Sequence, residues 1–280
     1  GTIDKEKVAV LADAGVNRFS LGVQSFIDRE LQLLGRVHNS DDAVRAIEIM
    51  RYSGVRNLSL DLIYGIPGQT MREWSYTLSK TLELSPEHIS AYELTPEEGT
   101  PLSDSIKDGS LQKPDEDVIL RMYYHAIDAL TASGYKHYEI SNFARQGFEC
   151  THNLNYWDRG QYIGLGAGAH SFIGDKRIKN TSDINRYINE LKTGKLSIED
   201  ETEISCEDAI KEFIFLGIRK TGGLNVKGFR DDLGIDLLDV SDKLINDGLL
   251  MSDGNYLRLT RKGIVVSNTV IIQMFEALEL

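Results

Sequence analysis

The sequence has 280 residues, 41% hydrophobic and 26% charged, which is enough for one large globular domain and a small second one. Its formal net charge of -12 disfavours a nucleic-acid partner, because such a surface repels phosphate backbones. No run is long and apolar enough to span a bilayer and no secretory signal is present, so we expect a cytoplasmic protein without an integral membrane segment.

The first third of the sequence predicts alternating helices and strands. Alternating apolar side chains predict strands at residues 17–24, 57–64 and 88–94. Helical periodicity predicts helices at residues 5–14, 28–34, 40–52 and 70–84. Strand–helix units at this spacing are typical of a parallel β/α architecture, either a barrel or an open sheet.

After residue 94 the regular alternation stops. Residues 95–113 contain prolines and glycines without a period and predict a long irregular segment. Further elements are predicted as a helix at 115–133, a strand at 135–141, a polar turn-rich loop at 142–162, a glycine-dense strand end at 163–172 and a helix at about 182–193.

The last 80 residues predict a separate module. Helices are expected at residues 203–219, 226–233 and 237–247, followed by a hairpin around Asp253-Gly254-Asn255 and a helix from Thr260. Three helices and a hairpin are the outline of a winged helix. From Glu203 onward the module has 13 acidic and 9 basic residues, so it is expected to be a structural or protein-contact module rather than a DNA reader.

Three polar residues form the first candidate site: Gln24 and Asp61 near predicted strand ends, and Arg36 after the loop that follows a strand. Ligands of βα folds bind where strands end and their loops converge. A carboxylate can accept from ribose hydroxyls, a guanidinium can pair with a carboxylate, and an amide can serve either partner. The set suits a charged nucleoside-like ligand, and the alternative is a buried polar network inside a barrel.

The segment His152–Trp157 is the second candidate. Histidine binds metals and haem iron, and flat aromatic side chains suit a planar macrocycle; simple packing of His152 beside Trp157 is the alternative. A G-x-G-x-G spacing at Gly164–Gly168 is a weak dinucleotide signal, and we favour close approach of a backbone or ligand as its reason. For His170 we favour a packed histidine over a ligand.

Six stretches together resemble the radical S-adenosylmethionine family around oxygen-independent coproporphyrinogen III oxidase, and within it the HemW-type haem chaperones. They are RFSLGVQSF (18–26), LDLIYGIPGQT (60–70), ISAYELTPEEGTPL (89–102), YEISNFA (138–144), HNLNYW (152–157) and GLGAGAHS (164–171). The resemblance implies a partial, TIM-like (β/α) barrel of the radical SAM type over residues 1–200. It also implies that the winged-helix-like α+β module occupies residues 201–280.

The resemblance further implies ligands and a function. Gln24, Arg36 and Asp61 would contact S-adenosylmethionine, Ala91 would lie near its adenine, and His152 would be the candidate haem ligand. The implied function is a haem chaperone that delivers haem to an acceptor protein, for example a respiratory one. Whether the protein forms a dimer stays open. The alternative is the oxidase itself, which would decarboxylate coproporphyrinogen III.

One feature of the family is missing from this sequence. The family holds its [4Fe-4S] cluster with a CxxxCxxC motif, whereas the only cysteines here are Cys150 and Cys206. We therefore expect the cluster ligands upstream of Gly1, with no metal ligand for the cluster and no catalytic residue in the chain. We also expect no reductive cleavage of S-adenosylmethionine by the chain as it stands.

Overall fold

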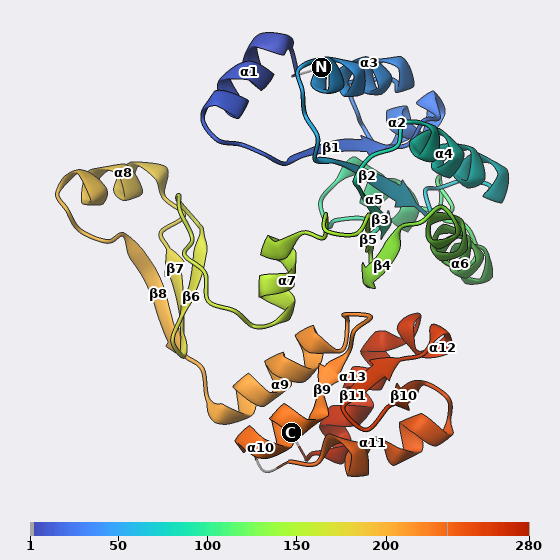
Figure 1. The fold of residues 1–280 in the computed structure, drawn as a ribbon. Helices are drawn as coiled ribbons and strands as arrows, with labels where there is room; N and C mark the ends of the chain where they lie inside the picture. Colours follow the sequence, from blue (N-terminus) through green and yellow to red (C-terminus); the bar gives the residue numbers. More distant parts are fainter. Residues whose placement is uncertain (1–2, 234, 280) are drawn as a thin grey trace. The chain divides into compact units, whose positions relative to one another are not determined.

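The computed structural model describes residues 3–233 and 235–279, and it divides into two compact units, residues 1–149 and 150–280 (Figure 1). The first unit contains a five-stranded sheet in the order β1-β2-β3-β5-β4. Its strands are β1 (Phe19–Gln24), β2 (Leu58–Tyr64), β3 (His88–Glu93), β4 (Lys136–Glu139) and β5 (Asn142–Ala144). Strands β1, β2 and β3 pair in parallel, while β5 is antiparallel to both neighbours, so within the described residues the sheet is mixed and not closed into a barrel.

Helices connect the parallel strands as the sequence predicts. They are α1 (Lys5–Asp13), α2 (Asp28–Leu33), α3 (Ser40–Tyr52), α4 (Met71–Glu83), α5 (Pro101–Lys107) and α6 (Glu116–Ala132). Helices α3 and α4 begin with capping boxes, formed by Asn39 with Asp42 and by Thr70 with Glu73. The predicted irregular segment 95–113 was wrong in part, because it contains α5. The Thr100 cap and Pro101 in the first turn are the local signals that start this helix.

The two faces of the sheet differ in chemistry. Leu58, Leu60 and Leu62 on β2 are fully buried on one face. The intervening Ser59 and Asp61 lie on the other, which we call the polar face, and side-chain alternation along a strand accounts for this division. On β2, therefore, one face supplies core packing and the other carries groups that can bind a ligand.

The second unit begins with a helix and an antiparallel sheet. Its elements are α7 (Thr151–Trp157), β6 (His170–Ile173), β7 (Lys176–Asn180), α8 (Ile184–Lys192) and β8 (Ile198–Glu203), with the sheet order β6-β7-β8. The prediction of a loop over residues 142–162 was wrong, because β5 and α7 both lie there. Antiparallel pairing of β5 with β3, a long-range contact, overrides the polar local sequence.

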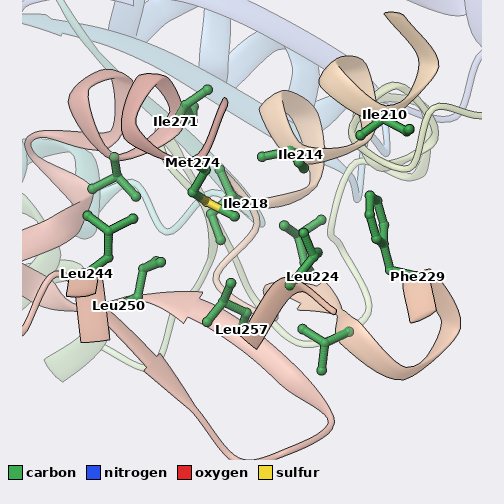
Figure 2. Close-up of a cluster of buried hydrophobic side chains, with 13 residues drawn as sticks. Ile210, Ile214, Ile218, Leu224, Phe229, Leu244, Leu250, Leu257, Ile271 and Met274 are labelled. Carbon is green, nitrogen blue, oxygen red and sulfur yellow. The ribbon is translucent and has the colours of Figure 1, made fainter. Parts of the chain in front are cut away.

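The C-terminal part of the second unit has the predicted winged-helix outline. Its elements are α9 (Cys206–Gly217), β9 (Leu224–Asn225), α10 (Val226–Leu233), α11 (Leu237–Asn246), β10 (Leu250–Ser252), β11 (Tyr256–Leu259), α12 (Arg261–Ile264) and α13 (Ser267–Ala277). A small antiparallel sheet in the order β10-β11-β9 packs with these helices around one apolar cluster (Figure 2). Ile214, Leu257 and Met274 are fully buried in it.

Two further expectations concern the chain as a whole. Among the helices of residues 3–233 and 235–279, none is both long and apolar enough to cross a membrane. The predicted division by domain type, residues 1–200 and 201–280, stays a prediction. When the chain is divided by how its residues pack together, the sheet β6-β7-β8 and the C-terminal module fall in the same compact unit.

Neighbouring residues on α13 allow a test of this core. Ile271 is 2% exposed within the apolar cluster, whereas Ile272 is 56% exposed. We expect Ile271→Ala to lower the free energy of unfolding by about 2–4 kcal/mol, because it removes buried methyl groups and leaves a cavity. The matched Ile272→Ala variant should change it by less than about 0.5 kcal/mol. Urea denaturation followed by circular dichroism measures both, and equal losses would contradict the assignment of the core.

Candidate functional site

Gln24 ends β1 in an uncommon backbone conformation. Its φ is 66°, in the left-handed region, and its side chain is 9% exposed. The register of β1 against β2 shifts between Gly22 and Gln24, as in a β-bulge. A Cβ placed on Gly22 would lie 2.7 Å from the Gln24 Nε2 atom. The amide of Gln24 therefore folds back over Gly22, which has no side chain to block it.

Asp61 lies on the same face of the sheet as this amide. It pairs in register with Gly22 on β1 and with Ser90 on β3. The hydroxyl of Ser20, two residues before Gly22 on β1, donates to both carboxylate oxygens at 3.0 and 2.9 Å. Because Gln24 covers Gly22 and Asp61 pairs with Gly22, the amide and the carboxylate occupy neighbouring positions on the polar face.

Arg36 lies at a cavity along β1 whose lining includes Ser20 and Gly22 but neither Gln24 nor Asp61. The cavity has a volume of about 340 Å³ and is lined by Ser20, Gly22 and Arg36, together with side chains of α3. A volume of this size is within the range of small-ligand sites. The guanidinium of Arg36 is exposed and, within the described residues, forms no ion pair. It is therefore available to a carboxylate on a ligand.

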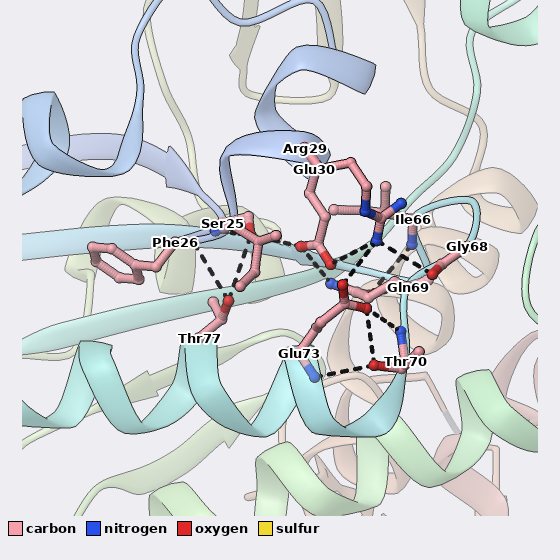
Figure 3. Close-up of polar contacts among 12 residues, drawn as sticks. Ser25, Phe26, Arg29, Glu30, Ile66, Gly68, Gln69, Thr70, Glu73 and Thr77 are labelled. Atoms are coloured by element: carbon pink, nitrogen blue, oxygen red, sulfur yellow. Dashed lines mark hydrogen bonds and ion pairs between the residues drawn. The ribbon is translucent and has the colours of Figure 1, made fainter.

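A buried carboxylate ties the two strand ends together (Figure 3). Glu30 is fully buried, and its Oε2 atom accepts from the hydroxyl of Ser25 at 2.6 Å and from Nε2 of Gln69 at 3.0 Å. The Oε1 atom of Gln69 in turn accepts from the backbone N–H of Gly65 at 2.8 Å. Burial raises the pKa of Glu30, and the two hydrogen bonds oppose that rise. The network fixes the turn after β2 against the residue that follows Gln24.

His88 is a buried titratable group on the polar face. Its Nδ1 atom lies 2.8 Å from the Ser59 hydroxyl, and its Nε2 atom lies 2.7 Å from the Tyr138 hydroxyl. Burial lowers the pKa of His88 to about 3, with a smaller contribution from the charge of Arg18. The imidazole is neutral at physiological pH and links β2, β3 and β4 through hydrogen bonds.

Ala91 lies one position beyond Ser90 on β3 and pairs with Leu62. Its side chain is 1% exposed and, by strand alternation, lies on the face opposite Asp61. Only the backbone of Ala91 can approach a nucleoside bound on the polar face. Its assignment to an adenine contact, like those of Gln24, Arg36 and Asp61 to the nucleoside, stays a prediction.

His152 lies on α7, in the second unit. Its side chain is exposed, and its ring meets the ring of Tyr156 edge-on at 4.8 Å between centroids. Tyr156 meets Tyr162 edge-on at 4.6 Å, and Tyr162 contacts Phe172 on β6 at 6.4 Å. We call these four residues the aromatic ladder. His152 and Tyr156 are both exposed, and His152 can offer an imidazole nitrogen to a metal while its ring packs against that of Tyr156.

The glycine-rich segment before β6 is held by the backbone of its own unit. A Cβ on Gly164 would lie 2.1 Å from the carbonyl oxygen of His170, so only glycine permits this approach. The side-chain amide of Asn180 donates to the carbonyls of Gly164 and Gly166 at 3.2 and 2.9 Å. Close backbone approach, which we favoured over a dinucleotide turn, is confirmed at Gly164. His170 is exposed rather than packed, so that expectation was wrong.

The side chains of this chain do not fit an iron–sulfur cluster. Such a cluster needs several cysteine thiolates, and the sequence contains two cysteines, Cys150 and Cys206. Across residues 3–233 and 235–279 there is no group of three His, Cys, Asp or Glu side chains arranged to hold a metal ion. The prediction that the cluster ligands precede Gly1 remains a prediction.

Sequence reasoning missed several residues that shape these sites. Ser20 could have been found, because it alternates with Phe19 and Leu21 on the predicted strand in the same way that Asp61 alternates with leucines. Glu30 and Gln69 gave no local signal of burial, since a glutamate and a glutamine beside helix starts are usually exposed. Only the packing of the two turns shows that they meet.

The mixed β/α sheet and the winged-helix module both lie in segments that match known protein families. Residues 1–80 match the family described as the Radical SAM superfamily, and residues 204–266 match the HemN C-terminal domain. The fold resembles that of coproporphyrinogen III oxidase (HemN) from Escherichia coli, with a TM-score of 0.79 and 22% identity, covering 98% of this chain and 67% of that one. At that identity the likeness shows the fold.

More similar sequences narrow the class. The chain is 37% identical over 272 residues to the heme chaperone HemW of Bacillus subtilis (strain 168), covering 96% of this chain and 72% of that protein. It is 33% identical over 281 residues to the heme chaperone HemW of Escherichia coli (strain K12), covering 97% and 71%. The chain belongs to the HemW-type family of radical S-adenosylmethionine proteins.

The neutral state of His88 predicts an acid-dependent loss of stability. The unfolded chain protonates this histidine near pH 6.5, whereas the folded one does so near its pKa of about 3. Between these values the unfolded state binds more protons, so the stabilisation is complete above pH 6.5 and is lost as the pH falls toward 3. We expect His88→Gln to flatten the fall in melting temperature between pH 6.5 and pH 4.

The matched control is His125→Gln. His125 is a half-buried residue of α6, and its ring forms a hydrogen bond with the hydroxyl of Ser75. This variant should retain the wild-type dependence of melting temperature on pH. Parallel profiles for wild type and His88→Gln would contradict the assigned neutral state.

Proposed function

We propose that this chain is a haem chaperone that binds haem and S-adenosylmethionine and passes haem to an acceptor protein. The proposal is supported by membership of a family whose relatives are named heme chaperone HemW. The single observation that carries it is the exposed imidazole of His152 at the end of the aromatic ladder. An accessible nitrogen donor beside packed aromatic rings suits a flat iron macrocycle.

The position of His152 also suits release of the haem. A chaperone must give up its cargo, so the bond to iron has to be open to exchange with a ligand from the acceptor. His152 is exposed on the surface of a seven-residue helix, and Tyr156 contacts one edge of the ring. An imidazole in such a place can bind iron without enclosing it. We propose an acceptor protein as the partner and a cytoplasmic location.

The polar face of the first unit is proposed as the site for S-adenosylmethionine. The carboxylate of Asp61 would accept from the ribose hydroxyls, the amide of Gln24 would bond to the amino-acid part, and Arg36 would pair with its carboxylate. The strained backbone of Gln24 supports this role, because a left-handed non-glycine residue costs about 1–3 kcal/mol and such strain clusters at functional sites. The bound molecule would supply sulfonium chemistry, and this chain would contribute binding and orientation.

The haem proposal is tested by His152→Ala. We expect the Soret absorption of added haem to lose intensity and shift, with affinity falling by about tenfold or more, because the iron loses a nitrogen ligand. Absorption titration with haemin measures both effects, and His125→Ala in the first unit is the control. An unchanged Soret band would show that His152 is not a haem ligand.

A decarboxylation assay with coproporphyrinogen III tests the oxidase alternative, and we expect no product.

The nucleoside proposal is tested by Gly22→Ala. The added methyl would displace the Gln24 amide, whose Nε2 lies 2.7 Å from the Cβ position, so affinity for S-adenosylhomocysteine should fall by about tenfold. The melting temperature should change little, since the displaced atom is the end of a flexible side chain. Gly222→Ala is the matched control, because nothing lies within 4 Å of its Cβ position. Equal affinities for both variants in calorimetry would refute the proposed role of the amide.

A further inference from the structure

A second cavity lies in the second unit, at α7, β6, β7 and α9. Its volume is about 510 Å³, and its apolar wall is made by Tyr156, Tyr162, Phe172 and Phe215. Two of these rings belong to α7 and the segment after it, one to β6 and one to α9. The volume and the aromatic lining are typical of small-molecule sites. Tyr156 and Tyr162 also belong to the aromatic ladder that ends at His152.

Two arginines share one carboxylate at this cavity. The Nε atom of Arg159 lies 2.8 Å from Oε2 of Glu212, and Nη1 of Arg177 lies 2.9 Å from Oε1 of the same residue. Both guanidiniums also face the ring of Phe172, with their Cζ atoms 4.6 and 5.5 Å from its centroid. All four residues line the cavity. Two positive charges and one negative charge leave this group with a net positive charge.

The arginines retain hydrogen-bond donors that no described residue accepts from. The Nη2 atom of Arg159 and the Nε atom of Arg177 are buried and have no partner within the residues that the structure describes. A buried N–H group without an acceptor lowers the stability of the folded protein, and the loss is larger when the group is charged, as in a guanidinium. The side chain of Arg159 is only 13% exposed. The cavity therefore offers charged donors to an anion that enters it.

Arg159 holds this position at a conformational cost. It follows the C-cap of α7 with φ at 54°, in the left-handed region where helix ends usually carry glycine. Glycine follows at position 160, and its own Cβ position is blocked by the side chain of Asn155, 2.1 Å away. An arginine with left-handed backbone makes the folded state less stable than a glycine would at the same position. The contacts of its side chain, to Glu212 and toward the cavity, offset that loss.

We propose that this cavity binds a carboxylate carried by a flat aromatic ligand, with Arg159 and Arg177 as the carboxylate-binding pair. Arginine binds carboxylates through paired, charge-assisted hydrogen bonds, and the surrounding aromatic rings pack against a planar ring system. The identity of the ligand rests on the proposed function. Haem carries two propionate groups on a flat macrocycle, so in this chain the pair would hold a propionate while His152 offers a nitrogen to iron.

The test compares protoporphyrin IX, a metal-free dicarboxylic acid, with its dimethyl ester, using quenching of porphyrin fluorescence. We expect wild type to bind the acid about tenfold more tightly than the ester, because only the acid pairs with the guanidiniums. Arg177→Gln and Arg159→Gly should each weaken binding of the acid by about tenfold and leave binding of the ester unchanged. Arg159→Gly also removes the backbone strain, which keeps the variant folded.

Arg186→Gln is the matched control, because Arg186 pairs with Glu190 on α8 and does not line the cavity. It should behave as wild type, and melting temperatures establish that all variants are folded. Equal binding of acid and ester by wild type, or equal weakening of both by the arginine variants, would overturn the inference. The outcome is independent of the haem proposal, since a metal-free porphyrin has no iron for His152. Failure of haemin to bind would contradict the proposed function. The preference for protoporphyrin IX over its dimethyl ester would still test the carboxylate-binding pair by itself.

Discussion

Glu30 joins the ends of the first two strands through one carboxylate oxygen. That atom accepts from Ser25 and from Gln69, and Gln69 accepts from the backbone of Gly65 in the next turn. The other oxygen has no hydrogen-bond partner in the described residues, and the Nη2 atom of Arg29 lies 3.8 Å from it. Leaving a buried acceptor without its hydrogen bond costs about 1–3 kcal/mol, and more for a charged group, so the network favours one arrangement of the two turns. That arrangement holds Ser25, the residue that follows Gln24.

Two residues with left-handed backbone lie at the two candidate sites. Gln24 ends β1 and Arg159 follows α7, and both would be less strained as glycine. In each case the side chain reaches a place that a regular continuation of the element would not give it. The amide of Gln24 lies over Gly22, and the guanidinium of Arg159 reaches Glu212. Backbone strain in these positions is best explained by what the side chains contact.

The two units carry different chemistry. The first presents hydroxyls, an amide and a carboxylate on the polar face, a set that suits a nucleoside, and the guanidinium of Arg36 lines a cavity along β1. The second presents packed aromatic rings, an exposed imidazole and two arginines, a set that suits a flat, anionic metal complex. A haem chaperone on a radical S-adenosylmethionine scaffold needs both kinds of ligand.

The sequence by itself determined the alternation of helices and strands in the first 94 residues and the winged-helix outline. Alternation along Leu58 to Leu62 predicted a strand here, because side chains along a strand alternate between its two faces with a period of two. It also indicated that Gln24 ends a strand, which is confirmed, and that Asp61 lies near a strand end, which was wrong because β2 continues to Tyr64. It did not show helix α7, which was expected as a loop because its seven residues are too few for a clear helical period.

Only the tertiary structure decided which polar groups meet. Gln24 reaches the polar face through a register shift and a left-handed backbone, neither of which side-chain alternation reports. Glu212 lies 53 residues from Arg159, and a contact at that separation leaves no local pattern in the sequence. The sequence records periodic burial, because burial follows the geometry of each element. Non-local polar contacts depend instead on how elements pack, and that information is spread over the whole chain.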